Sequence, residues 1–183
     1  MLSPNDEDPD TSERNSEDEM VGRFPVGPAL PAVAGLWNRF ADVVLGLFNY
    51  PTGDVGPDGT HEIDIEFARW GDTKNAMGNY TVWPVVKSLK QISKSFSFTS
   101  TSNQTTHRFI WSRDGVNFRS LEGHRQDDRK EINAWIYSPN QASLRVSQQP
   151  LPVHINLWLF KGLAPKNGLE VEVIIHNFEF TPE

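Results

Sequence analysis

Three acidic residues, Glu62, Asp64 and Glu66, alternate with apolar residues in one short stretch of the sequence. Successive side chains of a β-strand point to opposite faces, so this spacing places the three carboxyl groups on one face and the apolar residues on the other. The β-branched isoleucines between the acids also favour a strand over a helix. We therefore expect an apolar face that packs into a core. The acidic face should be open to water or to a cleft, because unpaired carboxylates are costly to bury.

Carboxyl groups held this close repel one another, which separates their pKa values so that one stays protonated while another is ionised. Glycoside hydrolysis needs this division, with one carboxylic acid to protonate the leaving oxygen and one carboxylate to attack or to activate water. The same spacing also occurs on solvated strand faces and on edge strands whose charges oppose aggregation. The residue types alone leave these interpretations open.

The run Glu62-Ile63-Asp64-Ile65-Glu66-Phe67 resembles the active-site signature of glycoside hydrolase family 16, which includes lichenases and laminarinases. The family signature is Glu-x-Asp-x-Glu, and the resemblance covers roughly residues 43–182. It implies that Glu62 is the nucleophile, that Glu66 is the general acid/base and that Asp64 hydrogen-bonds to the nucleophile. It further implies a concanavalin-like jelly roll whose concave sheet holds a polysaccharide, and an extracellular location.

Short strand-forming runs separated by turn residues continue to the end of the chain, which predicts an all-β sandwich or jelly roll. The expected strands cover residues 43–49, 61–67, 79–86, 92–98, 107–111, 116–121, 132–137, 143–147, 153–160 and 169–180. Asp114-Gly115 predicts a hairpin turn. Gly46, inside the first of these strands, indicates a bend or a close approach to a neighbouring chain segment.

Residues 1–20 hold eight acids and one base and so carry the whole net charge of −7. This composition predicts a disordered acidic arm. The three prolines between residues 24 and 34 predict a linker. We therefore assign residues 1–35 to an arm and linker and residues 36–183 to a jelly-roll domain. The resembling family has several strands before the one at residue 43. We therefore expect a jelly roll that is incomplete on its N-terminal side, with exposed sheet edges through which the chain could self-associate.

The remaining 163 residues hold 16 acids and 16 bases, so no basic excess draws them to nucleic acid. No apolar run approaches the ~20 residues of a membrane span. The absence of cysteine excludes disulfide and thiolate chemistry. The five histidines show no metal-binding spacing, and we expect no cofactor. The acidic start is unlike a signal peptide.

A second group of candidate residues lies in the expected strand 153–160, where His154, Asn156 and Trp158 share the face opposite to an aliphatic face that should point inward. An indole beside an amide suits a sugar, whose C–H face packs on the ring while its hydroxyls take hydrogen bonds. The resembling family often carries Asn-x-Trp in this strand. We predict Asn156, Trp158 and, just after the acidic strand, Trp70 as substrate contacts. For each tryptophan the alternative is a role in packing a loop.

The other aromatic candidates divide between cleft and core. Trp83 could line the cleft or fill the core, whereas Trp111 and Trp135 continue apolar alternation and are predicted to lie in the core. A lone histidine among apolar neighbours is more often a hydrogen-bonded structural residue than a catalyst, so His107 is expected to be structural.

Together, the residues and the resemblance predict a retaining, endo-acting glycoside hydrolase that cleaves a β-linked polysaccharide of the glucan or galactan type. The competing functions are a non-catalytic carbohydrate-binding jelly roll and an inactive truncated fragment of such an enzyme. A binding module has no need of three aligned carboxyl groups, and their presence favours the enzyme.

Overall fold

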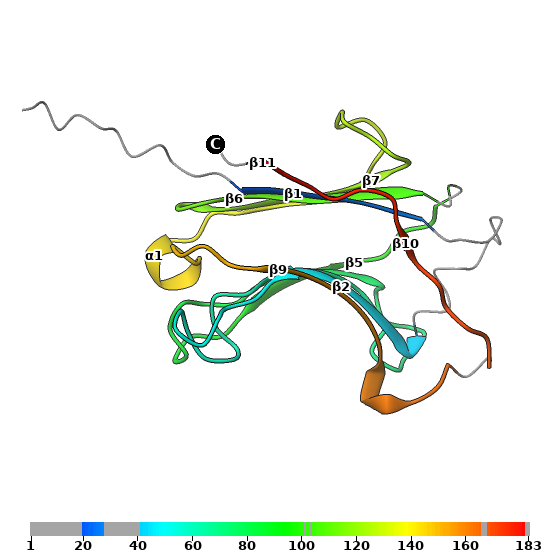
Figure 1. Cartoon of the computed structure of the whole chain (residues 1–183), viewed down its shortest axis with the longest axis horizontal. Helices are drawn as coiled ribbons and strands as arrows, with labels where there is room; N and C mark the ends of the chain where they lie inside the picture. The colour runs from blue at the N-terminus through cyan, green and yellow to red at the C-terminus, as the bar shows by residue number, and fades with distance from the viewer. Residues whose placement is uncertain (1–19, 28–40, 101, 103, 166–167, 182–183) are drawn as a thin grey trace, which may run out of the picture.

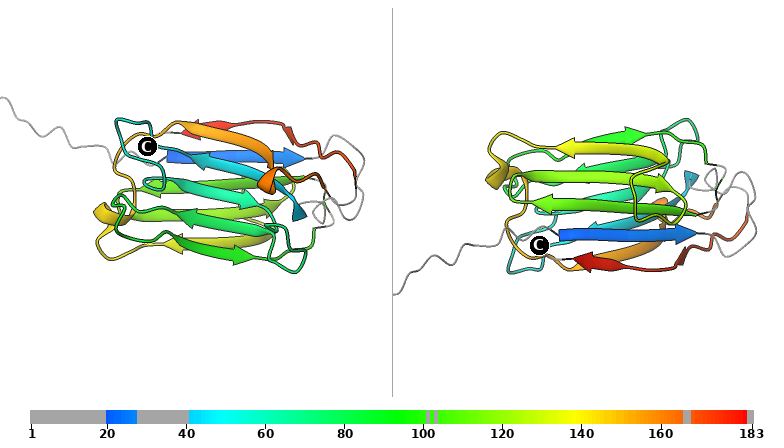
Figure 2. Two further views of the ribbon diagram at one scale, coloured as in Figure 1. Left: turned by 90° about the horizontal axis from the view of Figure 1, so that it is seen from below. Right: turned by 90° about the horizontal axis from the view of Figure 1, so that it is seen from above.

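The computed structural model describes residues 20–27, 41–100, 102, 104–165 and 168–181. These residues form two antiparallel sheets packed face to face, which confirms the predicted all-β sandwich (Figures 1 and 2). Within the described ranges, no helix is long and apolar enough to cross a membrane.

The first sheet has the strand order β10-β1-β6-β7-β8, and β11 also pairs with β1. Its strands are β1 (Met20–Gly27), β6 (Thr105–Ser112), β7 (Gly115–Glu122), β8 (Glu131–Tyr137), β10 (Ile174–Ile175) and β11 (Glu179–Thr181). The second sheet has the order β5-β4-β3-β2-β9. Its strands are β2 (Val43–Asn49), β3 (Ile63–Phe67), β4 (Gly78–Val82), β5 (Ile92–Phe96) and β9 (Val153–Leu159).

The core lies between the sheets and is built from the alternating inward side chains of both. Ile63, Ile65 and Phe67 of β3 are fully buried there, as the sequence pattern predicts. Across the core, the rings of Tyr80 and Phe118 stack with centroids 4.9 Å apart. Complete burial of one such large side chain contributes about 1.5–3 kcal/mol, so β3 is firmly anchored by its apolar face.

Strand β1 lies within residues 1–35, which the sequence assigns to an arm and linker. Its backbone pairs with β6 from Met20 to Val26, and its other edge pairs with β11 at residues 21–23 and with β10 at residues 26–27. Pro25 falls in the gap between those two pairings, a position where the missing amide hydrogen of proline is tolerated. Residues 20–27 therefore belong to the first sheet, while the rest of the range lies outside the described residues.

Two other segments differ from the sequence-based expectation. The strand expected at 143–147 is instead a single helical turn, α1 (Ala142–Arg145), which follows Gln141 in the left-handed conformation. The turn is closed by a hydrogen bond from the Val146 amide to the Ala142 carbonyl at 2.8 Å, and no residue within it is buried. The long last strand expected at 169–180 is reduced to β10 and β11, because only these parts pair with β1.

Candidate active site

The three acidic residues lie at the middle of the second sheet, where β3 runs between β2 and β4. Asp64 is in register with Phe48 of β2, and Glu66 is in register with Gly46. Glu62 directly precedes β3, and its carbonyl accepts a hydrogen bond from the Trp83 amide at 2.8 Å. Since Ile63, Ile65 and Phe67 point into the core, the three carboxyl groups share the outer face of the sheet.

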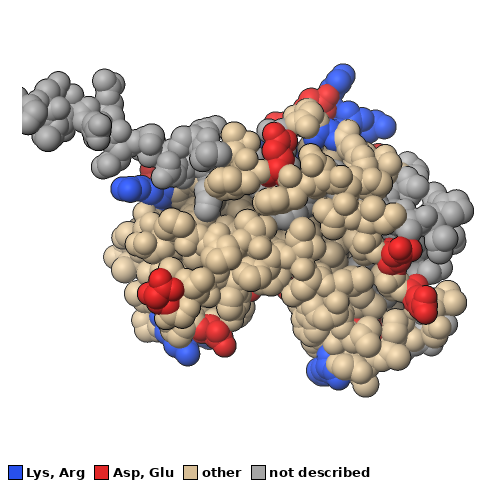
Figure 3. All heavy atoms as spheres, viewed as in Figure 1, with Lys and Arg blue, Asp and Glu red and all other residues tan. Residues whose placement is uncertain are grey.

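This outer face is hollowed. Figure 1 shows the second sheet curving away from the first, and the space-filling view in Figure 3 shows a hollow on the same side. Most of the atoms that line the hollow in this view belong to uncharged residues. A curved sheet brings side chains on its concave face closer together, as two carboxyl groups acting on one sugar would require.

Asp64 corrects the expectation that the whole acidic face is open to water, because only 3% of this residue is exposed. Its burial is tolerated because the carboxyl group has partners: the indole nitrogen of Trp83 donates to its Oδ2 at 2.9 Å, and Glu62 lies within hydrogen-bonding contact. Glu62 and Glu66 on either side are half-buried.

Burial raises the pKa of Asp64 well above its usual range, and the negative charges of Glu62 and Glu66 raise it further. The surroundings of Asp64 therefore favour its protonated form. A protonated carboxyl group can donate a hydrogen bond, and the neighbouring acceptor is Glu62.

The flanking glutamates are also perturbed. Burial raises the pKa of Glu62 to about 7, against the opposing effect of the hydrogen bond from Asp64, and the charges of Glu66 and Asp58 contribute to the rise. Burial raises the pKa of Glu66, while its contact with the Asn79 amide nitrogen at 3.4 Å acts in the opposite direction. The site thus contains three carboxyl groups whose pKa values are all raised above their ordinary range.

The predicted contacts Trp70 and Trp158 come together around a third ring, Phe160, which follows β9. The centroid of Phe160 lies 5.6 Å from that of Trp70 and 6.4 Å from that of Trp158. We call these three residues the Glu66-side aromatic cluster, because the pairing of Glu66 with Gly46 places them beyond that end of the acidic row. Phe160 continues the alternation of His154, Asn156 and Trp158 in the sequence, but it was not among the predicted contacts.

A second aromatic cluster lies beside the acidic row, with Phe48 and His154 level with Asp64, and the sequence analysis did not predict it. It consists of Phe48, Tyr50 and His154, here called the Glu62-side aromatic cluster. The Tyr50 hydroxyl donates to Asp58 at 2.8 Å, and this hydrogen bond is the main reason that the pKa of Tyr50 rises to about 12. The alternation of Gly46, Phe48 and Tyr50 along and just past β2 was the available signal.

Asn156 lies between the clusters, directly across from Gly46. Its side-chain oxygen accepts a hydrogen bond from the Gly46 amide at 3.1 Å, so this oxygen is already engaged. A Cβ atom added at Gly46 would lie 2.5 Å from the same oxygen, which confirms the expected close approach at this glycine. Of the three predicted contacts, Asn156 is therefore the one whose side chain is hydrogen-bonded to the backbone of the sheet.

The remaining aromatic predictions concern the interior. Trp111 is 5% exposed, and Trp135 packs against the core with its ring stacked on Phe118, so both are core residues as predicted. His107 is fully buried and contacts the hydroxyl groups of Ser120 and Thr105 through its two ring nitrogens. The inward aliphatic face predicted for β9 is only partly covered, because β9 is an edge strand and Leu157 remains 42% exposed.

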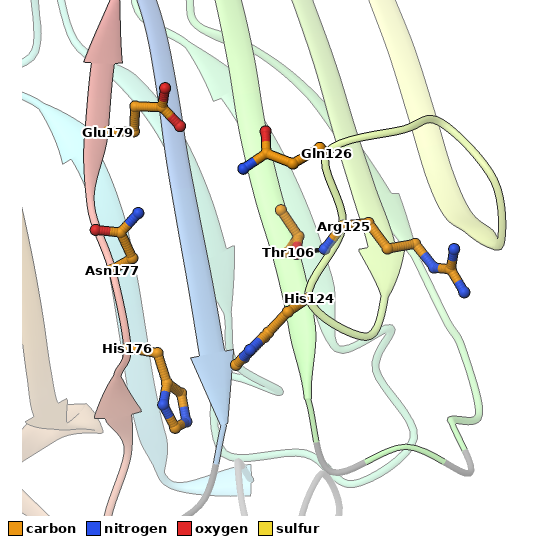
Figure 4. Close-up of a pocket in the computed structure, with 7 residues that line it drawn as sticks. All are labelled: Thr106, His124, Arg125, Gln126, His176, Asn177 and Glu179. Atoms are coloured by element: carbon orange, nitrogen blue, oxygen red, sulfur yellow. Dashed lines mark hydrogen bonds between the residues drawn. The ribbon is translucent and has the colours of Figure 1, made fainter.

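A separate hollow of about 320 Å³ lies on the outer face of the first sheet (Figure 4). It contains His124 and His176, whose ring centroids are 4.6 Å apart. Burial lowers the pKa of His124, and the neighbouring His176 lowers it further. Among the described residues, no group of three His, Cys, Asp or Glu side chains is placed to hold a metal ion, so this hollow is not a metal centre of that kind.

Comparison with known proteins gives a likeness to solved structures. No family model and no curated protein matches the chain. Among solved structures, a Bacillus licheniformis β-glucanase is similar over 78% of this chain, with 17% sequence identity and a TM-score of 0.46. The chain spans about half the length of that enzyme, since the match covers 54% of it. A likeness of this degree does not identify an activity or a catalytic residue.

Proposed function

We propose that the chain is a retaining, endo-acting glycoside hydrolase of the family 16 type that cleaves a β-linked polysaccharide. The observation that carries the proposal is the row of Glu62, Asp64 and Glu66 on the concave face of the second sheet, with a buried Asp64 that is hydrogen-bonded to Trp83 beside Glu62. A strand exposed only to water would have no reason to bury its central acid and supply it with an indole partner.

In the proposed reaction, the Glu62 carboxylate attacks the anomeric carbon while the glycosidic C–O bond breaks and Glu66 gives its proton to the leaving oxygen. The product of this step is a glycosyl ester on Glu62. Glu66, now ionised, takes a proton from water as the water oxygen attacks the anomeric carbon and releases Glu62. Asp64 holds Glu62 in place by donating a hydrogen bond to its ionised form.

The aromatic clusters support an endo-acting mode. The Glu66-side cluster lies beyond one end of the carboxyl row and the Glu62-side cluster lies beside the row, level with Asp64, so a sugar chain that crosses the sheet here would meet rings along the length of the row. The outer-face residues of β2, β3, β4 and β9 include no lysine or arginine. Three acids without an opposing base disfavour anionic chains, and we therefore propose a neutral glucan or galactan as the substrate.

A non-catalytic carbohydrate-binding module is the second candidate, and the aromatic clusters are the observation that favours it. Such a module would bind sugar equally well after Glu62 is neutralised and would release no reducing ends. The enzyme would lose turnover while retaining binding.

The test is reducing-end release from neutral β-glucans and galactans (mixed-linkage glucan, laminarin, xyloglucan and agarose), with carrageenan as the anionic comparison. Glu62→Gln and Glu66→Gln should each reduce the rate by more than about 10³-fold, as expected for loss of a nucleophile or an acid. Glu170→Gln, a change of the same kind at an exposed position outside the row, should retain the parental rate. No release from any polymer by protein shown to be folded would reject the enzyme, and binding alone would support the module.

A further inference from the structure

Trp83 contacts two members of the acidic row. It follows β4 immediately, and its backbone amide donates to the Glu62 carbonyl at 2.8 Å. Its indole nitrogen donates to Oδ2 of Asp64 at 2.9 Å. Trp83 therefore fixes the backbone of the proposed nucleophile and the side chain of the acid beside it.

The hydrogen bond to Asp64 also constrains where the proton of that acid can lie. An indole N–H is a donor only, so the oxygen that it contacts must act as an acceptor. A proton on Oδ2 would point against the indole hydrogen. In the protonated form of Asp64, the proton is therefore favoured on Oδ1, the oxygen that the indole does not contact.

The indole itself is held in place by its surroundings. Gly59 lies against the ring, since a Cβ atom added there would be 3.6 Å from the indole, and this glycine has the positive φ of 79° that its turn requires. The backbone next to Trp83 is also held, because the Pro84 carbonyl accepts a hydrogen bond from the His61 amide at 3.0 Å. The turn at Gly59 and this hydrogen bond therefore support the position of the indole beside Asp64.

We propose that Trp83 is a positioning residue that selects which oxygen of Asp64 carries the proton and thereby keeps Glu62 in the ionised form that attacks the sugar. The inference rests on the proposed function, because the role of Glu62 as nucleophile is part of that function. Trp83 acts through Asp64 and needs no contact with the substrate. The hydrogen bond from Trp83 also limits the rise in the pKa of Asp64 that burial causes.

The first test is Trp83→Phe, which removes the N–H group and keeps an aromatic ring under Gly59. We expect kcat to fall about tenfold, the effect of weakening the hydrogen bond that Asp64 donates to the charged Glu62, with KM changed less than about twofold. The acidic limb of the pH–rate profile should move to higher pH, since Glu62 loses part of its hydrogen bond. Trp135→Phe makes the same chemical change in the core and should leave the limb in place.

A double-mutant comparison separates action through Asp64 from a general structural effect. In an Asp64→Ala background no side-chain group is left for the indole to position, so adding Trp83→Phe should change kcat by less than about twofold. A further tenfold loss in that background would overturn the proposal.

The effect of Trp83 on the proton of Asp64 is also tested by an experiment that does not depend on turnover. Carbon-13 NMR titration of labelled Asp and Glu side chains should show higher pKa values for both Asp64 and Glu62 in Trp83→Phe than in the parent. Unchanged titration of Glu62 would overturn the inference. If the parent releases no sugar from any polymer but the shift is present, the proposed function fails and the role of Trp83 in placing the proton stands.

Discussion

Phe48 and His154 stack across β2 and β9, with ring centroids 5.3 Å apart and ring planes at 23°. Tyr50 packs edge-on against both rings, at 6.1 Å from each. The stack is level with Asp64, because Phe48 pairs with both Asp64 and His154, whereas Trp70, Trp158 and Phe160 lie beyond the Glu66 end of the row. Aromatic surface thus lies beside the row of carboxyl groups and beyond one of its ends, an arrangement suited to a chain that passes through the site.

Trp158 provides the first prediction, because 41% of it is exposed beside Phe160. Trp158→Ala should raise KM for a polysaccharide about tenfold, the effect of losing about 1–1.5 kcal/mol of ring–sugar contact, and should change kcat less. Kinetics on a series of oligosaccharides of increasing length would measure it. Ile136→Ala is the control, since this β8 residue is 71% exposed on the other sheet. Equal KM values for the parent and Trp158→Ala at every length would exclude a contact.

The second prediction concerns the pH dependence of turnover. Burial raises the pKa of Glu62 to about 7. As the pH drops below that value, the nucleophile becomes protonated, and kcat/KM should fall about tenfold per pH unit. The charge of Asp58 contributes to the raised pKa, and Asp58→Asn should therefore move the acidic limb to lower pH. Tyr50→Phe removes the hydrogen bond to Asp58 but keeps its charge, which makes it the matched comparison. A limb that stays in place in Asp58→Asn would contradict the assignment of that limb to Glu62.

The acidic row illustrates how far sequence alone reaches into the site. Alternation places Glu62, Asp64 and Glu66 on one face because the period of a strand is two, and burial of the intervening residues confirms that face. Neither the burial of Asp64 nor its bond to Trp83 could be predicted, since both depend on how closely β4 and the turn at Gly59 pack onto β3. Pairing between distant strands also creates the stack of Phe48 on His154, and no local pattern encodes that register.

The third prediction is that the acidic row destabilises the fold at neutral pH. Between about pH 4.5, where a glutamate titrates in an unfolded chain, and about pH 7, where Glu62 titrates in the fold, the folded state binds more protons than the unfolded state. The free energy of unfolding therefore falls as pH rises through this window. Glu62→Gln should raise the free energy of unfolding by about 1–3 kcal/mol at pH 8, with little effect at pH 4.

Urea unfolding of the parent and of Glu62→Gln at the two pH values measures this difference. Glu170→Gln controls for the loss of one negative charge at an exposed site. Equal stabilisation by Glu62→Gln at both pH values would show that the burial of a charged Glu62 is not its cause.

The fourth prediction concerns His107, whose burial lowers its pKa to about 3. The ordinary histidine pKa of 6.5 applies to the unfolded chain, so between these values the unfolded state binds more protons. The free energy of unfolding should therefore fall as pH decreases, by about 2 kcal/mol from this residue between pH 7 and pH 5. His107→Gln, which cannot titrate, should lose that part of the pH dependence. Urea unfolding at both pH values tests it, and an identical slope in parent and variant would contradict it.

At the level of the fold, the sequence predicts strands that bury one face and is less informative about strands that depend on distant partners. Val43–Asn49 and Ile63–Phe67 carry their own apolar pattern, and both form as expected. Strand β1 contains a proline and depends on β6 for its pairing, and the segment around Leu144 forms a helical turn because it buries no side chain. In both segments tertiary pairing, rather than local propensity, decides the structure.

The most direct test of the account is chemical rescue by azide, using an activated aryl glycoside of whichever sugar chain the protein cleaves. Glu62→Ala should be inactive alone and should regain activity with azide, giving the α-glycosyl azide, because azide enters from the face that Glu62 vacates. Glu66→Ala should give the β-glycosyl azide through an intact Glu62. Formation of the α-azide by Glu66→Ala, or undiminished hydrolysis by Glu62→Ala, would contradict the assignment of Glu62 as the nucleophile.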